Sequence, residues 1–300
     1  MYFVRAADVV VAPMSIYRSP AGRQALETVY AEAVDELDVT VDEEQIDTRH
    51  GSTHILMVGP EHGQPVLVFH GGNATNPMTL AWFTGLADDY RLISPDIIGQ
   101  PGHSAETRLD PQGDGYGEWV VDLLDAFDLH SAPMIGTSYG SGIILRTAAL
   151  APERIERAAL VVPAGFGIGP LLPMLKVGLP AILYRFLGSD WLLDLVLSEM
   201  VTQAEADPVV RETIAASLRH VELEREFPEA DAAELEAFTA PVAVFAAEND
   251  PFFPPDAIIP RARDRVPDLT ETEVLAEEKH ILSPTGQGKV TESIRGFFET

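Results

Sequence analysis

The 300-residue chain is long enough for one large α/β domain or a domain with an insertion, and its 46% hydrophobic residues can supply a sizeable core. It has no cysteine, which excludes disulfides, thiolate metal sites and a cysteine nucleophile. Its 47 acidic residues outnumber the 20 basic ones to give a net charge of −27, which disfavours binding to nucleic acid or to an anionic membrane.

The basic residues are themselves unusual, because only Lys176, Lys279 and Lys289 are lysines. An acidic, lysine-poor surface is similar to that of proteins from salt-loving archaea, in which high salt screens self-repulsion. An acidic bacterial proteome of high GC content is the alternative source. If the halophile interpretation holds, the protein will unfold at a higher temperature in molar salt than in dilute buffer.

Targeting signals are the next feature to consider. Residues 1–14 carry an apolar patch that is broken by Asp8 and Pro13, which does not fit a secretory signal. The longest uncharged run, Ala158 to Leu175, contains three glycines and three prolines, which argues against a membrane helix. We therefore expect a cytoplasmic protein that does not bind membranes.

The first predicted elements are a helix and a hairpin. Residues 19–37 favour a helix, because Ser19 suits its cap and Pro20 its first turn. Residues 38–60 alternate loosely in hydropathy, which predicts a hairpin of antiparallel strands. The unbroken apolar run at 65–69 then fits a strand buried on both faces.

Strands and helices alternate at short intervals through most of the remaining chain. Further strands are predicted at 91–94, 132–135, 158–162, 242–246 and 271–276. Helices are predicted at 78–88, 117–129, 141–150, 255–266 and 285–298. This alternation indicates βαβ units and a mostly parallel sheet.

A G-x-S-x-G motif, Gly136-Thr137-Ser138-Tyr139-Gly140, lies between a predicted strand and a predicted helix. In that context the turn holds the serine in strained backbone geometry, and only glycine fits at Gly136 and Gly140. The strain exposes the Ser138 hydroxyl at the end of the sheet, facing the positive end of the next helix. A plain Gly/Ser turn is the alternative interpretation of the pentapeptide alone.

A serine nucleophile needs a base, and the base needs an orienting acid. In the chain order described for this motif, the acid and then the histidine follow the serine. Asp250 follows the strand at 242–246 and His280 follows the strand at 271–276, so both belong at the same sheet edge as Ser138. Glu248 and Asp256 compete with Asp250, whereas the rival histidines lie in the hairpin, in the loop of His103, before the serine or, for His220, in the predicted lid.

The developing oxyanion needs two fixed donors. One is expected to be the backbone N–H of Tyr139, directly after the nucleophile. The other should come from the glycine pair in His70-Gly71-Gly72-Asn73, where bare backbone can approach the substrate. Gly72 is our choice and Gly71 the fallback.

The alternation stops between residues 166 and 238. Helical periods continue there, apolar over 171–197 and acidic over 205–236. Ordinary core helices are one interpretation; a helical lid over the strand ends is the one we favour. The lid divides the chain into a core of 1–165 and 239–300, with an N-terminal helical extension at 1–40, and a cap at 166–238. Apolar residues such as Phe166, Leu171 and Leu172 are candidates to line a substrate pocket beneath the cap.

Together these motifs resemble the α/β-hydrolase superfamily, in its carboxylesterase-like group, over about residues 60–298. The match includes the glycine pair after His70, Asp96 with Pro101-Gly102-His103-Ser104, and the serine motif with Asp250 and His280. The resemblance implies an eight-stranded, mostly parallel sheet flanked by helices, a helical cap after the sixth strand, and hydrolysis through an acyl-enzyme without a cofactor. Lys279 departs from the family, which often has glycine there.

The expected function is therefore that of a serine carboxylesterase acting on short or medium acyl esters. Ser138 would attack the carbonyl, His280 would carry the proton and Asp250 would orient His280. Lactonase, carbon–carbon bond hydrolase and acyltransferase chemistry remain alternatives, as does a catalytically silent ligand-binding module. We expect a small-molecule ester as partner, a monomer or homodimer, and no metal site.

Overall fold

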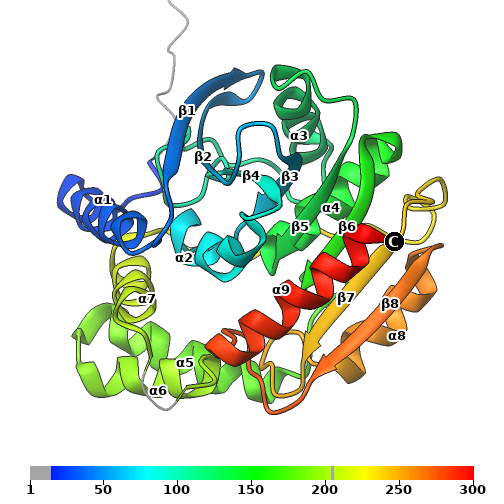
Figure 1. The fold of residues 1–300 in the computed structure, drawn as a ribbon. Helices are drawn as coiled ribbons and strands as arrows, with labels where there is room; N and C mark the ends of the chain where they lie inside the picture. Colours follow the sequence, from blue (N-terminus) through cyan, green and yellow to red (C-terminus); the bar gives the residue numbers. More distant parts are fainter. Residues whose placement is uncertain (1–14, 204–205) are drawn as a thin grey trace, which may run out of the picture.

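The computed structural model describes residues 15–203 and 206–300. They form one eight-stranded sheet in the order β1-β2-β4-β3-β5-β6-β7-β8 (Figure 1). The pairs β1–β2 and β2–β4 are antiparallel, and the other pairs are parallel. The prediction of a mostly parallel eight-stranded sheet flanked by helices is confirmed.

The element bounds lie close to the predicted ones. The strands are β1 (Val41–Thr48), β2 (Gly51–Val58), β3 (Gln64–Phe69), β4 (Tyr90–Pro95), β5 (Ala132–Thr137), β6 (Ile155–Val161), β7 (Val242–Ala247) and β8 (Leu269–Leu275). The helices are α1 (Pro20–Asp35), α2 (Asn76–Leu80), α3 (Gly115–Ala126), α4 (Tyr139–Leu150), α5 (Leu171–Leu187), α6 (Asp190–Met200), α7 (Pro208–His220), α8 (Pro255–Arg265) and α9 (Pro284–Glu299). Short 3₁₀ helices are η1 (Ala81–Leu86) and η2 (Pro152–Arg154).

Helix α1 begins as its sequence predicts. The Ser19 hydroxyl accepts the Gly22 N–H at 3.0 Å, and Pro20 occupies the first turn. The segment predicted as one helix at 78–88 is instead split between α2 and the 3₁₀ helix η1. There the backbone N–H of Ala87 donates to the carbonyl of Thr84 at 2.9 Å, the three-residue spacing of a 3₁₀ turn.

The central strands are apolar throughout because both faces of the sheet are covered. Along β5, Met134 packs into one core cluster and its neighbour Ile135 into the other. Helices α3, α4 and α8 supply the first cluster, and η1 and α9 supply the second (Figure 1). Two cores of this kind hold the carboxyl ends of the strands rigidly, where the candidate site lies.

Helices α5, α6 and α7 are inserted between β6 and β7, after the sixth strand (Figure 1). The acidic half of this insertion is less helical than predicted: α7 ends at His220, and residues 222–238 form turns and irregular chain. Their carboxylates bond to nearby backbone instead, as when Glu224 accepts the N–H groups of Arg225 and Glu226 at 2.8 and 3.1 Å. Glu205, the first acid of the predicted stretch, lies outside the described residues.

Residues 1–14, on which the expected lack of a secretory signal partly rests, also lie outside the described residues. Within the described part of the chain, no helix combines the length and apolarity needed to cross a membrane.

Candidate active site

Ser138 sits in the turn between β5 and α4, where its backbone adopts φ 51° and ψ −114°. A Cβ atom on Gly136 would lie 2.6 Å from the backbone nitrogen of Ser141. One on Gly140 would lie 2.3 Å from the carbonyl oxygen of Phe69. The two motif glycines are therefore required by close backbone contacts, and the turn has the strained geometry that the motif predicts.

The loops after β7 and β8 bring an aspartate and a histidine to this serine. His280 Nε2 lies 3.1 Å from Ser138 Oγ, and His280 Nδ1 lies 2.8 Å from Asp250 Oδ2. The other Asp250 oxygen accepts the N–H groups of Phe252 and Phe253 at 2.8 and 3.0 Å. The structure thus brings together the three residues that the sequence predicts, in a chain of hydrogen-bonding groups.

The competing acids are placed elsewhere. Glu248 accepts the backbone N–H of Glu277 at 2.9 Å, so its carboxylate helps to hold the loop rather than the histidine. Asp256 is exposed in the first turn of α8. Asp250, by contrast, is only 3% exposed.

The glycine pair after β3 lies against the serine turn. A Cβ atom on Gly72 would lie 3.1 Å from Tyr139 Cβ, so a side chain there would crowd the turn. The Gly71 N–H points to Thr79 Oγ1 at 3.4 Å, whereas the N–H groups of Gly72 and Tyr139 have no acceptor among residues 15–203 and 206–300. This difference favours Gly72 over Gly71 as the second oxyanion donor.

His70 fixes the loop that carries Gly72. Its Nδ1 donates to the carbonyl of Gly71 at 2.8 Å, and its Nε2 accepts the N–H of Ile97 at 2.9 Å. Burial lowers the pKa of this fully buried ring, which keeps it neutral in that pattern of one donor and one acceptor. Sequence reasoning included His70 only as part of a motif and missed this role.

Aromatic side chains surround the histidine and the turn. Phe252 and Phe253 lie with ring centroids 5.1 and 5.7 Å from that of His280. The Tyr139 and Tyr116 hydroxyls lie 2.9 Å apart, and burial raises the pKa of Tyr116 to about 12 and that of Tyr139 further above its usual value. Both phenols are therefore neutral near pH 7, and Tyr139 is expected to act through its backbone.

The three residues predicted to line a substrate pocket differ in burial. Phe166 is fully buried in the core cluster, and Leu171 and Leu172 are 68% and 69% exposed on the outer side of α5. That these residues line a substrate pocket stays a prediction. Helix α5 is apolar on nearly every side, so the spacing of its apolar residues does not show which of them face the interior.

The insertion is hydrogen-bonded directly to the loop of His280. The Thr202 hydroxyl accepts the N–H of Lys279 at 2.8 Å and donates to the carbonyl of Ile281 at 3.1 Å, so it brackets His280. The Ile281 N–H donates to the carbonyl of Met200 at 2.8 Å. Thr202 carries no sequence signal, because its partners lie almost eighty residues further along the chain.

Two neighbours of His280 complete this support. The Lys279 ammonium donates to the carbonyl of Ser198 in the last turn of α6, which gives this lysine a structural role. The buried Glu278 carboxylate accepts the N–H and hydroxyl of Ser283 at 2.8 and 2.5 Å, and its carbonyl accepts the N–H of Asn249 at 2.8 Å. Glu278 therefore ties the loop of the acid to the loop of the histidine.

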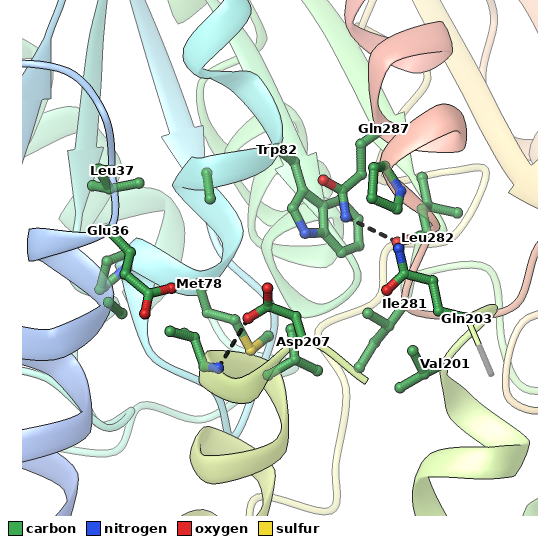
Figure 2. Close-up of a pocket in the computed structure, with 16 residues that line it drawn as sticks. Glu36, Leu37, Met78, Trp82, Val201, Gln203, Asp207, Ile281, Leu282 and Gln287 are labelled. Carbon is green, nitrogen blue, oxygen red and sulfur yellow. Dashed lines mark hydrogen bonds between the residues drawn. The ribbon is translucent and has the colours of Figure 1, made fainter. Parts of the chain in front are cut away.

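Figure 2 shows a cavity of about 220 Å³ beside this loop, between α1, α2, the start of α7 and residues 281–287. Met78, Trp82 and Ile281 supply apolar walls, and Glu36 and Asp207 lie at the rim. Neither Ser138, Asp250 nor His280 lines it. The cavity adjoins the histidine loop without being the centre of the site.

Side chains that could bind a metal ion are the last feature of the site to consider. Within residues 15–203 and 206–300, no group of three histidine, aspartate or glutamate side chains is arranged to hold a metal ion.

Comparisons with known proteins agree with this geometry. Residues 64–198 match the family model of the alpha/beta hydrolase fold. The chain is 27% identical over 264 residues to the uncharacterized carboxylesterase nap of Bacillus subtilis, covering 84% of this chain and 85% of that protein. It is 34% identical over 127 residues to carboxylesterase YbfK of the same organism, covering 40% of each.

Among solved structures, the crystal structure of naproxen esterase from Bacillus subtilis superimposes with a TM-score of 0.79 at 24% identity, covering 92% of this chain and 97% of that one. This structural similarity supports the fold, and the sequence matches support the similarity to carboxylesterases. The sheet order, the strained serine turn and these matches show that the chain has the α/β-hydrolase fold and is similar to carboxylesterases.

Proposed function

We propose that this protein is a serine carboxylesterase that hydrolyses small esters through an acyl-enzyme. The observation that carries the proposal is the position of His280, whose two ring nitrogens lie 3.1 Å from Ser138 Oγ and 2.8 Å from Asp250 Oδ2. That arrangement activates a serine hydroxyl without a cofactor. The two Bacillus subtilis relatives named as carboxylesterases support ester bonds as the target.

The reaction follows from the geometry. Asp250 holds the proton on His280 Nδ1, so Nε2 is free to take the hydroxyl proton as Ser138 Oγ attacks the ester carbonyl carbon. The oxyanion that forms is met by the unpartnered N–H groups of Gly72 and Tyr139. His280 then gives the proton to the leaving alcohol, and water releases the acid by the same steps in reverse.

Hydrolysis of p-nitrophenyl butyrate in molar KCl tests the proposal, with wild type measured beside Ser138→Ala. Loss of the nucleophile is expected to lower kcat at least roughly a thousandfold. Ser131→Ala removes a hydroxyl next to the opposite end of β5 and serves as the matched control, with activity near that of wild type.

A wild-type protein that is folded but turns over no ester would contradict the proposal. A panel of lactones, diketone ring-fission products and acyl-acceptor alcohols then distinguishes the lactonase, carbon–carbon hydrolase and acyltransferase alternatives. Inactivity on the whole panel would leave a binding module.

A further inference from the structure

Helix α5 presents its apolar side to solvent. Of its 17 residues, only Val177 and Tyr184 are fully buried. Its outward positions are large apolar side chains that are 42% to 76% exposed: Leu171, Leu172, Leu175, Leu179, Ile182, Leu183, Phe186 and Leu187. A surface helix normally has polar residues at such positions, so this face lacks a partner among residues 15–203 and 206–300.

The exposed surface extends beyond α5. Ile168 precedes the helix and Trp191 follows it at the start of α6, and they are 45% and 65% exposed. We call these two residues and the eight outward positions of α5 the cap face. Helices α5 and α6 contact each other and lie at the lower edge of the molecule in Figure 1.

The cap face is also unusual in charge. The chain has 47 acidic residues, yet the 32 positions from 158 to 189 contain none. On α5 itself the charged residues are Lys176 and Arg185, and Arg185 is held by Glu222 at 3.2 Å. Two copies of a chain with a net charge of −27 repel each other over most of their surface, but their α5 helices can meet without opposing carboxylates from α5 itself; the next acid along the chain is Asp190, which is exposed beside Trp191.

The size of the cap face fits a stable interface. Its exposed fractions correspond to roughly 1,000 Å² of apolar surface, compared with about 800 Å² per partner in a standard protein–protein interface. Monomeric soluble proteins rarely expose contiguous apolar patches of more than a few hundred Å².

We propose that the cap face is a homodimer interface, in which α5 packs against α5 of a second copy across a twofold axis. One apolar helix is self-complementary under that symmetry, as a closed dimer requires. The stem of Lys176 can lie along the contact while its ammonium reaches solvent at the edge. The assignment is independent of the chemistry proposed for Ser138.

Sedimentation velocity and light scattering of the full chain at micromolar concentrations test this inference. Wild type is expected to be a dimer, and Leu179→Glu and Phe186→Glu are expected to be monomers, because each places buried, repelling carboxylates at the contact. Leu150→Glu is the matched control. It changes a leucine that is 39% exposed at the end of α4, outside the cap face, and should leave the dimer intact.

Salt sharpens the test. Molar KCl should tighten the dimer, because it screens the repulsion between two acidic chains and does not weaken apolar contacts. Unchanged circular dichroism and a cooperative thermal transition will show that the substituted chains are folded, and their melting temperature is expected to fall modestly because they lose the stabilisation that dimerisation provides.

A wild type that stays monomeric in molar KCl would overturn the inference, and so would a dimer that survives both cap-face substitutions. If the monomer binds neutral phosphatidylcholine vesicles through the cap face, the surface is a lipid-docking face and the dimer assignment is wrong.

Discussion

Two buried aspartate–histidine pairs lie at the carboxyl ends of strands in this molecule, and they differ in what the second ring nitrogen meets. Asp250 follows β7 and lies 2.8 Å from His280 Nδ1, and Asp96 follows β4 and lies 3.3 Å from His54 Nδ1. Both aspartates also accept backbone N–H groups, in the case of Asp96 that of His103 at 2.7 Å.

The two pairs differ in the group that the second ring nitrogen of the histidine contacts. His280 Nε2 meets the neutral hydroxyl of Ser138, whereas His54 Nε2 meets the Glu43 carboxylate at 2.9 Å. Burial opposes a charge on His54, but Asp96 and Glu43 outweigh it and raise the pKa of His54. A histidine between two carboxylates holds its proton, and one between a carboxylate and a hydroxyl can pass a proton on. From this comparison we expect catalysis to depend on Asp250–His280 and stability to depend on Asp96–His54.

The largest expected effect comes from making the same substitution in each pair. Asp250→Asn should lower kcat/KM for an ester by about 10⁴-fold, because the histidine loses its orientation and its required tautomer. Asp96→Asn should change kcat/KM by no more than a few-fold. Initial rates on p-nitrophenyl butyrate, with both variants at matched folded fractions, check the contrast; comparable losses in both would break it.

The free energy of unfolding should show the reverse order, with the larger loss in Asp96→Asn. Asp96→Asn removes a carboxylate that burial disfavours but that His54 and the His103 N–H stabilise, and whose pKa they hold below its usual value. The expected cost is about 3 kcal/mol of unfolding free energy, measured by urea denaturation in molar KCl. Asp122→Asn breaks the exposed contact to Arg49 and is the control, at under about 1 kcal/mol. Equal losses would remove the distinction between the two aspartates.

A smaller effect is expected where the insertion holds His280. Thr202→Val removes the hydroxyl that bonds both neighbours of His280 and should lower kcat roughly tenfold with little change in KM. Thr202→Ser keeps the hydroxyl and should restore most of kcat. A loss confined to KM, or no rescue by serine, would show that Thr202 does not position the histidine.

The smallest expected effect is a change of folding stability with pH. Because the pKa of His54 is raised in the folded chain, its contribution is fully present below the unfolded value of 6.5 and is lost as pH rises through the folded pKa. The melting temperature of wild type minus that of His54→Gln should therefore be largest near about pH 6 and shrink toward about pH 9. A difference that grows with pH would contradict the assigned direction.

The sequence predicted the sheet and the candidate triad because both depend on local patterns. Ser138 and Asp250 each follow a buried apolar strand, His280 follows the edge strand β8, and the ends of parallel strands meet at one edge. The pairing of Asp96 with His54 was not predicted, because it joins a hairpin strand to a loop through side chains without a recognisable spacing.

Features of the insertion were harder to predict. From the sequence we expect Leu171 and Leu172 to line a pocket, but both are exposed. Because α5 is apolar nearly all round, its pattern does not show which side faces the interior. Helical spacing among the acids at 222–238 was overridden by side-chain bonds to backbone, such as those of Asp231 to Ala233 and Glu234. Thr202 meets Lys279 only once the chain is folded, so no sequence pattern marks it.

The most direct test of the account is the rate at which a fluorophosphonate labels Ser138 in wild type, Asp250→Asn and Asp96→Asn, with the labelled peptide identified by mass spectrometry. The reagent reports the activated serine without requiring the natural substrate. We predict labelling at Ser138 at similar rates in wild type and Asp96→Asn, and at least roughly a hundredfold slower labelling in Asp250→Asn. Labelling at another residue, or equal slowing in both variants, would contradict the account.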